Sequence, residues 1–122
     1  MRAYLDGRGA TAGSQSLRAV LYADSAGTPG SRLATSSAVT INAGRAAGWV
    51  IFTLPATVSL QAGIYYWVGL HSGTADKISR FAGTSVASAL RWNLDAYSDG
   101  PSSPFGAVKT DSTQLAAFAT GG

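Results

Sequence analysis

Turn-forming residues divide this chain roughly every 8–15 residues, a spacing that is typical of β-sandwiches and barrels. Gly, Pro and Asp mark the clearest predicted turns, which are 24–30, 61–63 and 99–106. Glutamate is absent, and lysine occurs only at Lys77 and Lys109, so strong helix formers are scarce. The sequence therefore predicts strands joined by tight loops rather than long exposed helices.

Small, β-branched and aromatic residues fill the intervals between these turns and predict about eight or nine strands. The predicted strands are 3–6, 16–23, 33–41, 49–54, 57–60, 64–71, 78–81, 90–96 and 114–120. Strand patterns do not alternate with helix patterns, which argues against a parallel α/β fold. We expect an all-β fold, an antiparallel two-sheet jelly-roll-like sandwich of about eight strands.

The chain has 122 residues, the usual size of one domain, and we expect a single β-sandwich domain over 1–122. Segment 3–6 reads as a strand that is shortened at its N-terminal side, and Gly121 and Gly122 read as a linker stub. These features predict a domain of a larger protein or assembly, in which a neighbour supplies missing strand pairing.

Composition excludes several classes of function. Cysteine is absent, which rules out disulfide scaffolds and thiolate zinc sites. The net charge of +3 arises from basic residues scattered along the chain, so no nucleic-acid-binding stripe is predicted. No apolar run is long enough for a membrane span, and residues 1–6 lack a signal-peptide pattern. An extracellular or virion location then requires a signal in a longer parent, or transport within an assembly.

Catalytic constellations are not found in the sequence. The six acidic residues are all aspartates, and most stand beside turn residues, where Asp usually caps the local backbone. His71 is the only histidine, and no Gly-x-Ser-x-Gly elbow supports a Ser-His-Asp triad. We expect a protein that is not an enzyme and holds no cofactor. Calcium at Asp95 and Asp99 is a weak alternative to turn capping.

The strand predicted at 64–71 alternates between two faces. We expect the more aliphatic face in the core: Ile64, Tyr66, Val68 and Leu70. The other face gathers two large aromatic rings and the histidine: Tyr65, Trp67 and His71. If exposed, the rings form a platform for a sugar, and the imidazole bonds its hydroxyls. The alternative is that both faces of this strand are buried in the middle of the fold.

The segment 90–97 alternates in the same way. We expect an inward face made of Leu90, Trp92, Leu94 and Ala96. The opposite face carries polar groups of the kind that recognise sugar hydroxyls: Arg91, Asn93, Asp95 and Tyr97. The alternative is a solvated face with cross-strand charge pairs, which is common on antiparallel sheets.

Three segments resemble a recurrent β-sandwich module of bacteria and phages. They are "YLDGRGATAGSQSLRAVLYADSAGTPGSRL", "GIYYWVGLHSG" and "RWNLDAYSDGPSSPFG", in that order, and the resemblance covers nearly the whole chain. It implies a jelly-roll, carbohydrate-binding-like accessory domain of secreted proteins or of phage tail and structural proteins. The family implies no catalytic residues. This chain departs from the family at its N-terminus, where a preceding strand is expected.

We therefore expect a non-catalytic extracellular binding or adhesion module that recognises carbohydrate or a cell-surface glycan. The candidate ligand-binding residues are Tyr65, Trp67, His71, Arg91, Asn93, Asp95 and Tyr97. The alternative is a structural virion protein, a phage tail or capsid-decorating subunit. Such a subunit assembles through strand edges and loops, as a homo-oligomer or with neighbours in a parent protein. Its support is the low share of charged residues, 12%.

Overall fold

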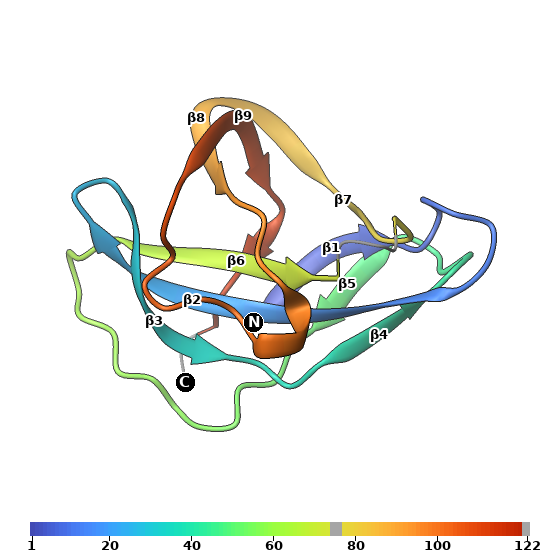
Figure 1. Ribbon diagram of the computed structural model, residues 1–122, viewed down its shortest axis with the longest axis horizontal. Helices are drawn as coiled ribbons and strands as arrows, with labels where there is room; N and C mark the ends of the chain where they lie inside the picture. Colours follow the sequence, from blue (N-terminus) through green and yellow to red (C-terminus); the bar gives the residue numbers. More distant parts are fainter. Residues whose placement is uncertain (74–76, 121–122) are drawn as a thin grey trace.

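The computed structural model describes residues 1–73 and 77–120 and shows about ten strands in three antiparallel sheets, none of them closed (Figure 1). The strands are β1 Arg2–Asp6, β2 Ser14–Ser25, β3 Thr28–Thr35, β4 Val39–Asn42, β5 Gly48–Ile51, β6 Tyr66–Ser72, β7 Arg80–Phe81, β8 Gly83–Trp92, β9 Lys109–Leu115 and β10 Ala117–Phe118. One short 3-10 helix, η1, covers Tyr97–Asp99. The all-β prediction is confirmed, but the structure has three sheets where two were expected.

The strand β2 is the centre of the first sheet, the β2 sheet. Residues 14–17 and 20–25 of β2 pair with β4 and β3, which follow each other along one edge. Residues 17–23 pair with β6 along the opposite edge, without a break in register. The long strand is therefore covered on both edges.

The strand β1 is the centre of the second sheet, the β1 sheet. It pairs with β5 along one edge and with β10 and then β7 along the other. The first strand is thus paired on both edges within the chain, and the prediction that the domain belongs to a larger protein or assembly stays a prediction. The predicted linker stub at 121–122 lies outside the described residues.

The hydrophobic core lies between the β1 sheet and the β2 sheet. Its largest fully buried side chains come from both sheets and from the segment after β5: Leu5, Leu17, Ile41 and Phe52. The core-facing side chains of β6, Val68 and Leu70, pack against this cluster but are only half-buried. The core side chains are thus buried on β2 but remain partly exposed on β6.

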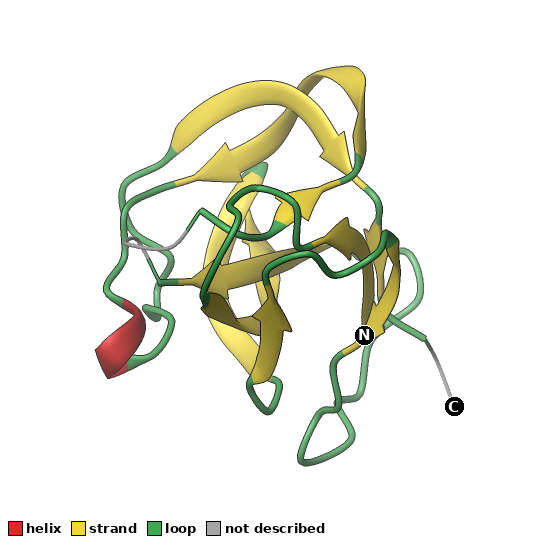
Figure 2. Cartoon of the chain, turned by 90° about the vertical axis from the view of Figure 1, so that its right-hand side faces the viewer, coloured by secondary structure: helices red, strands yellow, loops and turns green. Residues whose placement is uncertain are grey.

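The third sheet is the β8–β9 hairpin, which stands over β6 as a separate layer (Figures 1 and 2). Its register is interrupted between Ser85 and Leu90. The sequence predicted strands only at 90–96 and 114–120, because 83–89 and 109–113 carry small and polar residues without an apolar alternation. These stretches form strands by pairing across the hairpin, residues 83–85 with 113–115 and residues 90–92 with 109–111, and that pairing is not visible in either stretch alone.

Two further predictions need correction. The strand predicted at 33–41 is divided into β3 and β4, because the Ser36 hydroxyl accepts a hydrogen bond from the Ala19 N–H at 2.8 Å. This side-chain bond takes the place of one backbone bond in the ladder and lets the chain change direction. The strand predicted at 57–60 is an irregular segment between β5 and β6.

The junction of β1 and β7 is closed by an ion pair. The Asp6 carboxylate accepts hydrogen bonds from Arg80 Nε at 2.9 Å and Nη2 at 2.7 Å, and also from the Arg8 N–H at 2.9 Å. These bonds favour the charged carboxylate and lower the pKa of Asp6 from 3.8 to about 2. The folded protein therefore binds this proton more weakly than the unfolded chain does.

We expect the Asp6 contribution to stability to be present above about pH 4 and to disappear as the pH falls to about 2. Asp6→Asn removes the titrating group, so its unfolding midpoint in urea should fall less steeply over this range than that of the wild type. Asp111→Asn, which removes an exposed carboxylate on β9, is the control. Equal slopes for Asp6→Asn and wild type would contradict the prediction.

Candidate functional site

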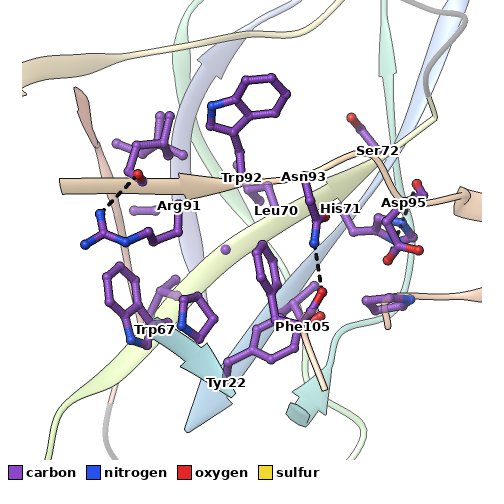
Figure 3. A pocket seen from close by; sticks show the side chains of 18 of the residues that line it. Tyr22, Trp67, Leu70, His71, Ser72, Arg91, Trp92, Asn93, Asp95 and Phe105 are labelled. Carbon is purple, nitrogen blue, oxygen red and sulfur yellow. Dashed lines mark hydrogen bonds and ion pairs between the residues drawn. The ribbon is translucent and has the colours of Figure 1, made fainter. Parts of the chain in front are cut away.

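A groove of about 590 Å³ lies between the outer face of the β2 sheet and the β8–β9 hairpin (Figure 3). Side chains of β2 and β6 form its floor, the hairpin forms its roof, and the segment after β8 forms one end. Most of the lining is aromatic or aliphatic, with a few polar groups among them. A cavity of this size and composition is typical of a small-molecule binding site.

The register of β2 and β6 places the floor residues. Tyr22 is opposite Trp67, Val20 is opposite Gly69, and Arg18 is opposite His71. Because side chains alternate along a strand, these residues share the face turned away from the core. Gly69 lies in the middle of this row, and a Cβ added there meets no atom within 4 Å. The floor therefore has a hollow above Gly69, with Trp67 and His71 on either side.

Trp67 is fixed from two directions. Its indole Nε1 donates a hydrogen bond to Asp24 Oδ1 at 2.8 Å. The Arg91 guanidinium lies 5.3 Å from the centre of the Trp67 ring, a cation–π distance. That guanidinium also donates hydrogen bonds to the backbone carbonyls of Ser88 and Leu90 in β8. Arg91 thus connects the hairpin to the floor (Figure 3).

His71 is buried at the other side of the hollow. Its ring stacks on Tyr97 with centroids 5.2 Å apart, and its Nε2 is 3.6 Å from Asp95 Oδ2. The Arg18 guanidinium lies 4.5 Å from the centre of the Tyr97 ring. Among the described residues, no hydrogen-bond partner reaches the buried Nδ1 of His71. A buried polar atom without a partner is uncommon in folded proteins, which makes this nitrogen a notable feature of the site.

Hydrogen bonds within the chain from 93 to 107 form a clasp at one end of the groove. Asp95 accepts from the Ser102 N–H at 2.8 Å and from the Ser102 hydroxyl at 2.9 Å. Asn93 donates its amide to the carbonyls of Phe105 and Ala107, at 2.8 Å and 3.1 Å. This clasp holds the end of the groove in place.

Tyr22 joins the floor to the same clasp. Its hydroxyl donates to the Ser102 carbonyl at 2.8 Å, and its ring meets the Phe105 ring edge to face, with centroids 5.3 Å apart. Burial raises the pKa of the Tyr22 hydroxyl, so the neutral, donating form is favoured. Figure 3 shows the two rings side by side beneath Asn93.

The structure brings most of the sequence-predicted site residues together. Five of them line the groove: Trp67, His71, Arg91, Asn93 and Asp95. Tyr97 supports His71 from behind, and its hydroxyl is 2.7 Å from Ser16 Oγ. Tyr65 precedes β6, is 83% exposed, and is not among the groove-lining residues. Asn93 and Asp95 belong to the clasp, so their polar groups already form hydrogen bonds within the chain.

The prediction that the alternate residues of 90–96 beginning with Leu90 point into the core is wrong. The strand β8 ends at Trp92, and beyond it Leu94 is 79% exposed. Trp92 is exposed as well, lines the groove, and carries Lys109 Nζ 4.7 Å from its ring centre. Trp92 lies on the β8–β9 hairpin and borders the open groove, so no packed sheet covers its side chain.

The part of the chain that is described contains no group of three or more potential metal-ligating His, Cys, Asp or Glu side chains. Both oxygens of the Asp95 carboxylate already accept hydrogen bonds from Ser102. The calcium hypothesis stays a prediction. Within the same described ranges, no helix is long and apolar enough to cross a membrane.

Comparisons of the chain with models of known protein families, with curated proteins and with solved structures found no match. The module that the three sequence segments resemble therefore remains an expectation.

Breaking the clasp should lower the free energy of unfolding by a measurable amount. Asp95→Ala removes two hydrogen bonds to a charged acceptor, each worth about 1.5–3 kcal/mol in general, so we expect a loss of about 2–4 kcal/mol in the free energy of unfolding. Chemical denaturation measures this loss. Asp99→Ala on the neighbouring η1, where the side chain is exposed, is the matched control and should cost less than about 0.5 kcal/mol. Similar costs for both variants would show that the clasp is not stabilising.

Proposed function

We propose that this protein is a non-catalytic extracellular or virion-borne module that binds carbohydrate in the groove between β6 and the β8–β9 hairpin. The observation that carries the proposal is the hollow above Gly69. It is bordered by the ring of Trp67 and by the buried His71, whose Nδ1 has no partner among the described residues. The jelly-roll carbohydrate-binding-like accessory module that the sequence resembles is consistent with this use.

The chemistry of the hollow suits a sugar. Apolar faces of pyranose rings pack on aromatic side chains, and Trp67 and Trp92 supply rings on the floor and the roof. Hydroxyls need donors and acceptors at fixed places, which His71 and the guanidinium of Arg91 supply. Because Gly69 has no side chain, a ring has room to lie between these groups.

A glycan-array screen at high protein loading tests the proposal. Gly69→Leu should fill the hollow without backbone strain and weaken sugar binding by about tenfold or more, and Trp67→Ala should do the same by removing a stacking surface. Tyr65→Ala removes an exposed ring outside the groove and is the matched control. Absence of sugar binding by the wild type, or a loss with Tyr65→Ala alone, would overturn this assignment of the site.

A second candidate function, a structural subunit of an assembly, is favoured by an exposed apolar patch on the outer face of the β1 sheet. Trp49 is 48% exposed and Ile51 is 59% exposed, and the Trp49 ring meets the Phe118 ring with centroids 5.2 Å apart. Trp49 also meets the Tyr4 ring edge to face at 5.3 Å. Exposed apolar patches of this kind often mark contacts between proteins.

If this patch joins copies of the chain, light scattering should give a mass at least twice that of the monomer. Ile51→Lys should restore the monomer mass, because a buried unpaired charge in the contact is costly. Val86→Lys places the same charge at an exposed apolar residue of β8 and should leave the mass unchanged. A wild-type protein that stays monomeric at high concentration would exclude self-assembly through the patch.

A further inference from the structure

We propose that the free edge of β6 binds an extended acidic polypeptide segment, which adds to the β2 sheet as a further strand. The β6 edge is defined here as the side of Tyr66–Ser72 that faces away from β2. The groove is lined by every residue from Tyr66 to Ser72, from both faces of the strand. A cavity that touches both faces of one strand runs along its edge.

The hydrogen-bond pattern shows which backbone groups are turned toward this edge. Ala19 donates its N–H to the Ser36 hydroxyl and accepts from the Ser36 N–H, at 2.8 Å and 2.9 Å, so both of its backbone groups point away from β6. Leu70 is opposite Ala19 and is therefore in a non-hydrogen-bonded pair. By the antiparallel alternation, the N–H and C=O groups of Val68, Leu70 and Ser72 point outward.

These outward groups have no ladder partner in the described part of the chain, because β6 pairs only with β2. Val68 and Leu70 point their side chains toward the core, yet they are only half-buried, whereas Leu17 and Ala19 on the neighbouring strand are buried. An added strand would pair with the backbone groups and cover the exposed side of Val68 and Leu70. Both effects would favour its binding.

The β6 edge also lacks the protection that strand edges normally carry. Edges are usually guarded by charged residues, proline, bulges or short length. The sequence of β6 has no Lys, Arg, Asp, Glu or Pro, and its pairing with β2 is regular over seven residues. In contrast, β9 carries Lys109 and Asp111, β3 carries Pro29 and Arg32, and β5 has four residues.

The groove selects the chemistry of the added strand. Side chains on one face of this strand would lie beside Val68 and Leu70, so they should be apolar. Side chains on its other face would lie near Arg91, the guanidinium of which lies at the roof over the Trp67 ring. The lining carboxylate of Asp95 is already bonded to Ser102. An alternation of apolar and acidic residues fits these surroundings.

The probe that tests the proposal is a random library of displayed peptides of seven residues, the length of β6, selected on the whole protein. Enriched peptides are then titrated against three proteins. Ser72→Pro removes one outward N–H, Ser72→Ala keeps that N–H and removes only the hydroxyl, and the wild type is the reference. Hydrogen exchange of the Val68 and Leu70 amides is followed with and without peptide.

We expect peptides with alternating apolar and acidic residues to be enriched. Their Kd should rise by about tenfold or more with Ser72→Pro and stay unchanged with Ser72→Ala. The exchange of the Val68 and Leu70 amides should slow when peptide is bound. If circular dichroism shows that Ser72→Pro is unfolded, the amide exchange of the wild type decides by itself.

No enriched peptide, or bound peptide that leaves both amides unprotected, overturns the proposal. This inference does not rest on sugar recognition, which uses the hollow above Gly69 on the face of β6 rather than its edge. Loss of peptide binding in Ser72→Pro, with sugar binding retained, would support the β6 edge as the site of the peptide alone.

Discussion

The rest of the structure depends on β2, because both of its edges pair with other strands and its two faces line the core and the groove. Its edges pair with β3 and β4 on one side and with β6 on the other. Leu17 and Ala19 close the core against the β1 sheet, while Val20 and Tyr22 form the floor of the groove. The same twelve residues therefore set the stability of the fold and the position of the site.

The groove depends on contacts that bring a distant part of the chain back to β2. Ser102 is held by Asp95 and by the Tyr22 hydroxyl, and Phe105 packs on the Tyr22 ring. Each contact is a modest one, but together they fix the end of the groove and leave the space above Gly69 open. Asn93 and Asp95, which were expected to touch a ligand, line the groove and also form hydrogen bonds that hold its end together; their contact with a ligand stays a prediction.

The groove and the β6 edge have one origin in the topology. The β8–β9 hairpin pairs with itself and not with β6, so β6 remains the last strand of the β2 sheet on that side. Its face forms a floor with Trp67 and His71, and its edge presents the backbone of Val68 and Leu70. A sheet that ended in a guarded strand would offer neither surface in this form.

The alternation of the sequence by itself determined the strand class and the two faces of β6 from Tyr66 to His71, because side-chain direction has a period of two along any strand. It failed for the β8–β9 hairpin, for the division at Ser36 and for Leu94. Those features depend on which strand lies beside or beneath a residue, which is a long-range property. Whether a face meets a packed sheet or an open groove was therefore decided only by the tertiary structure.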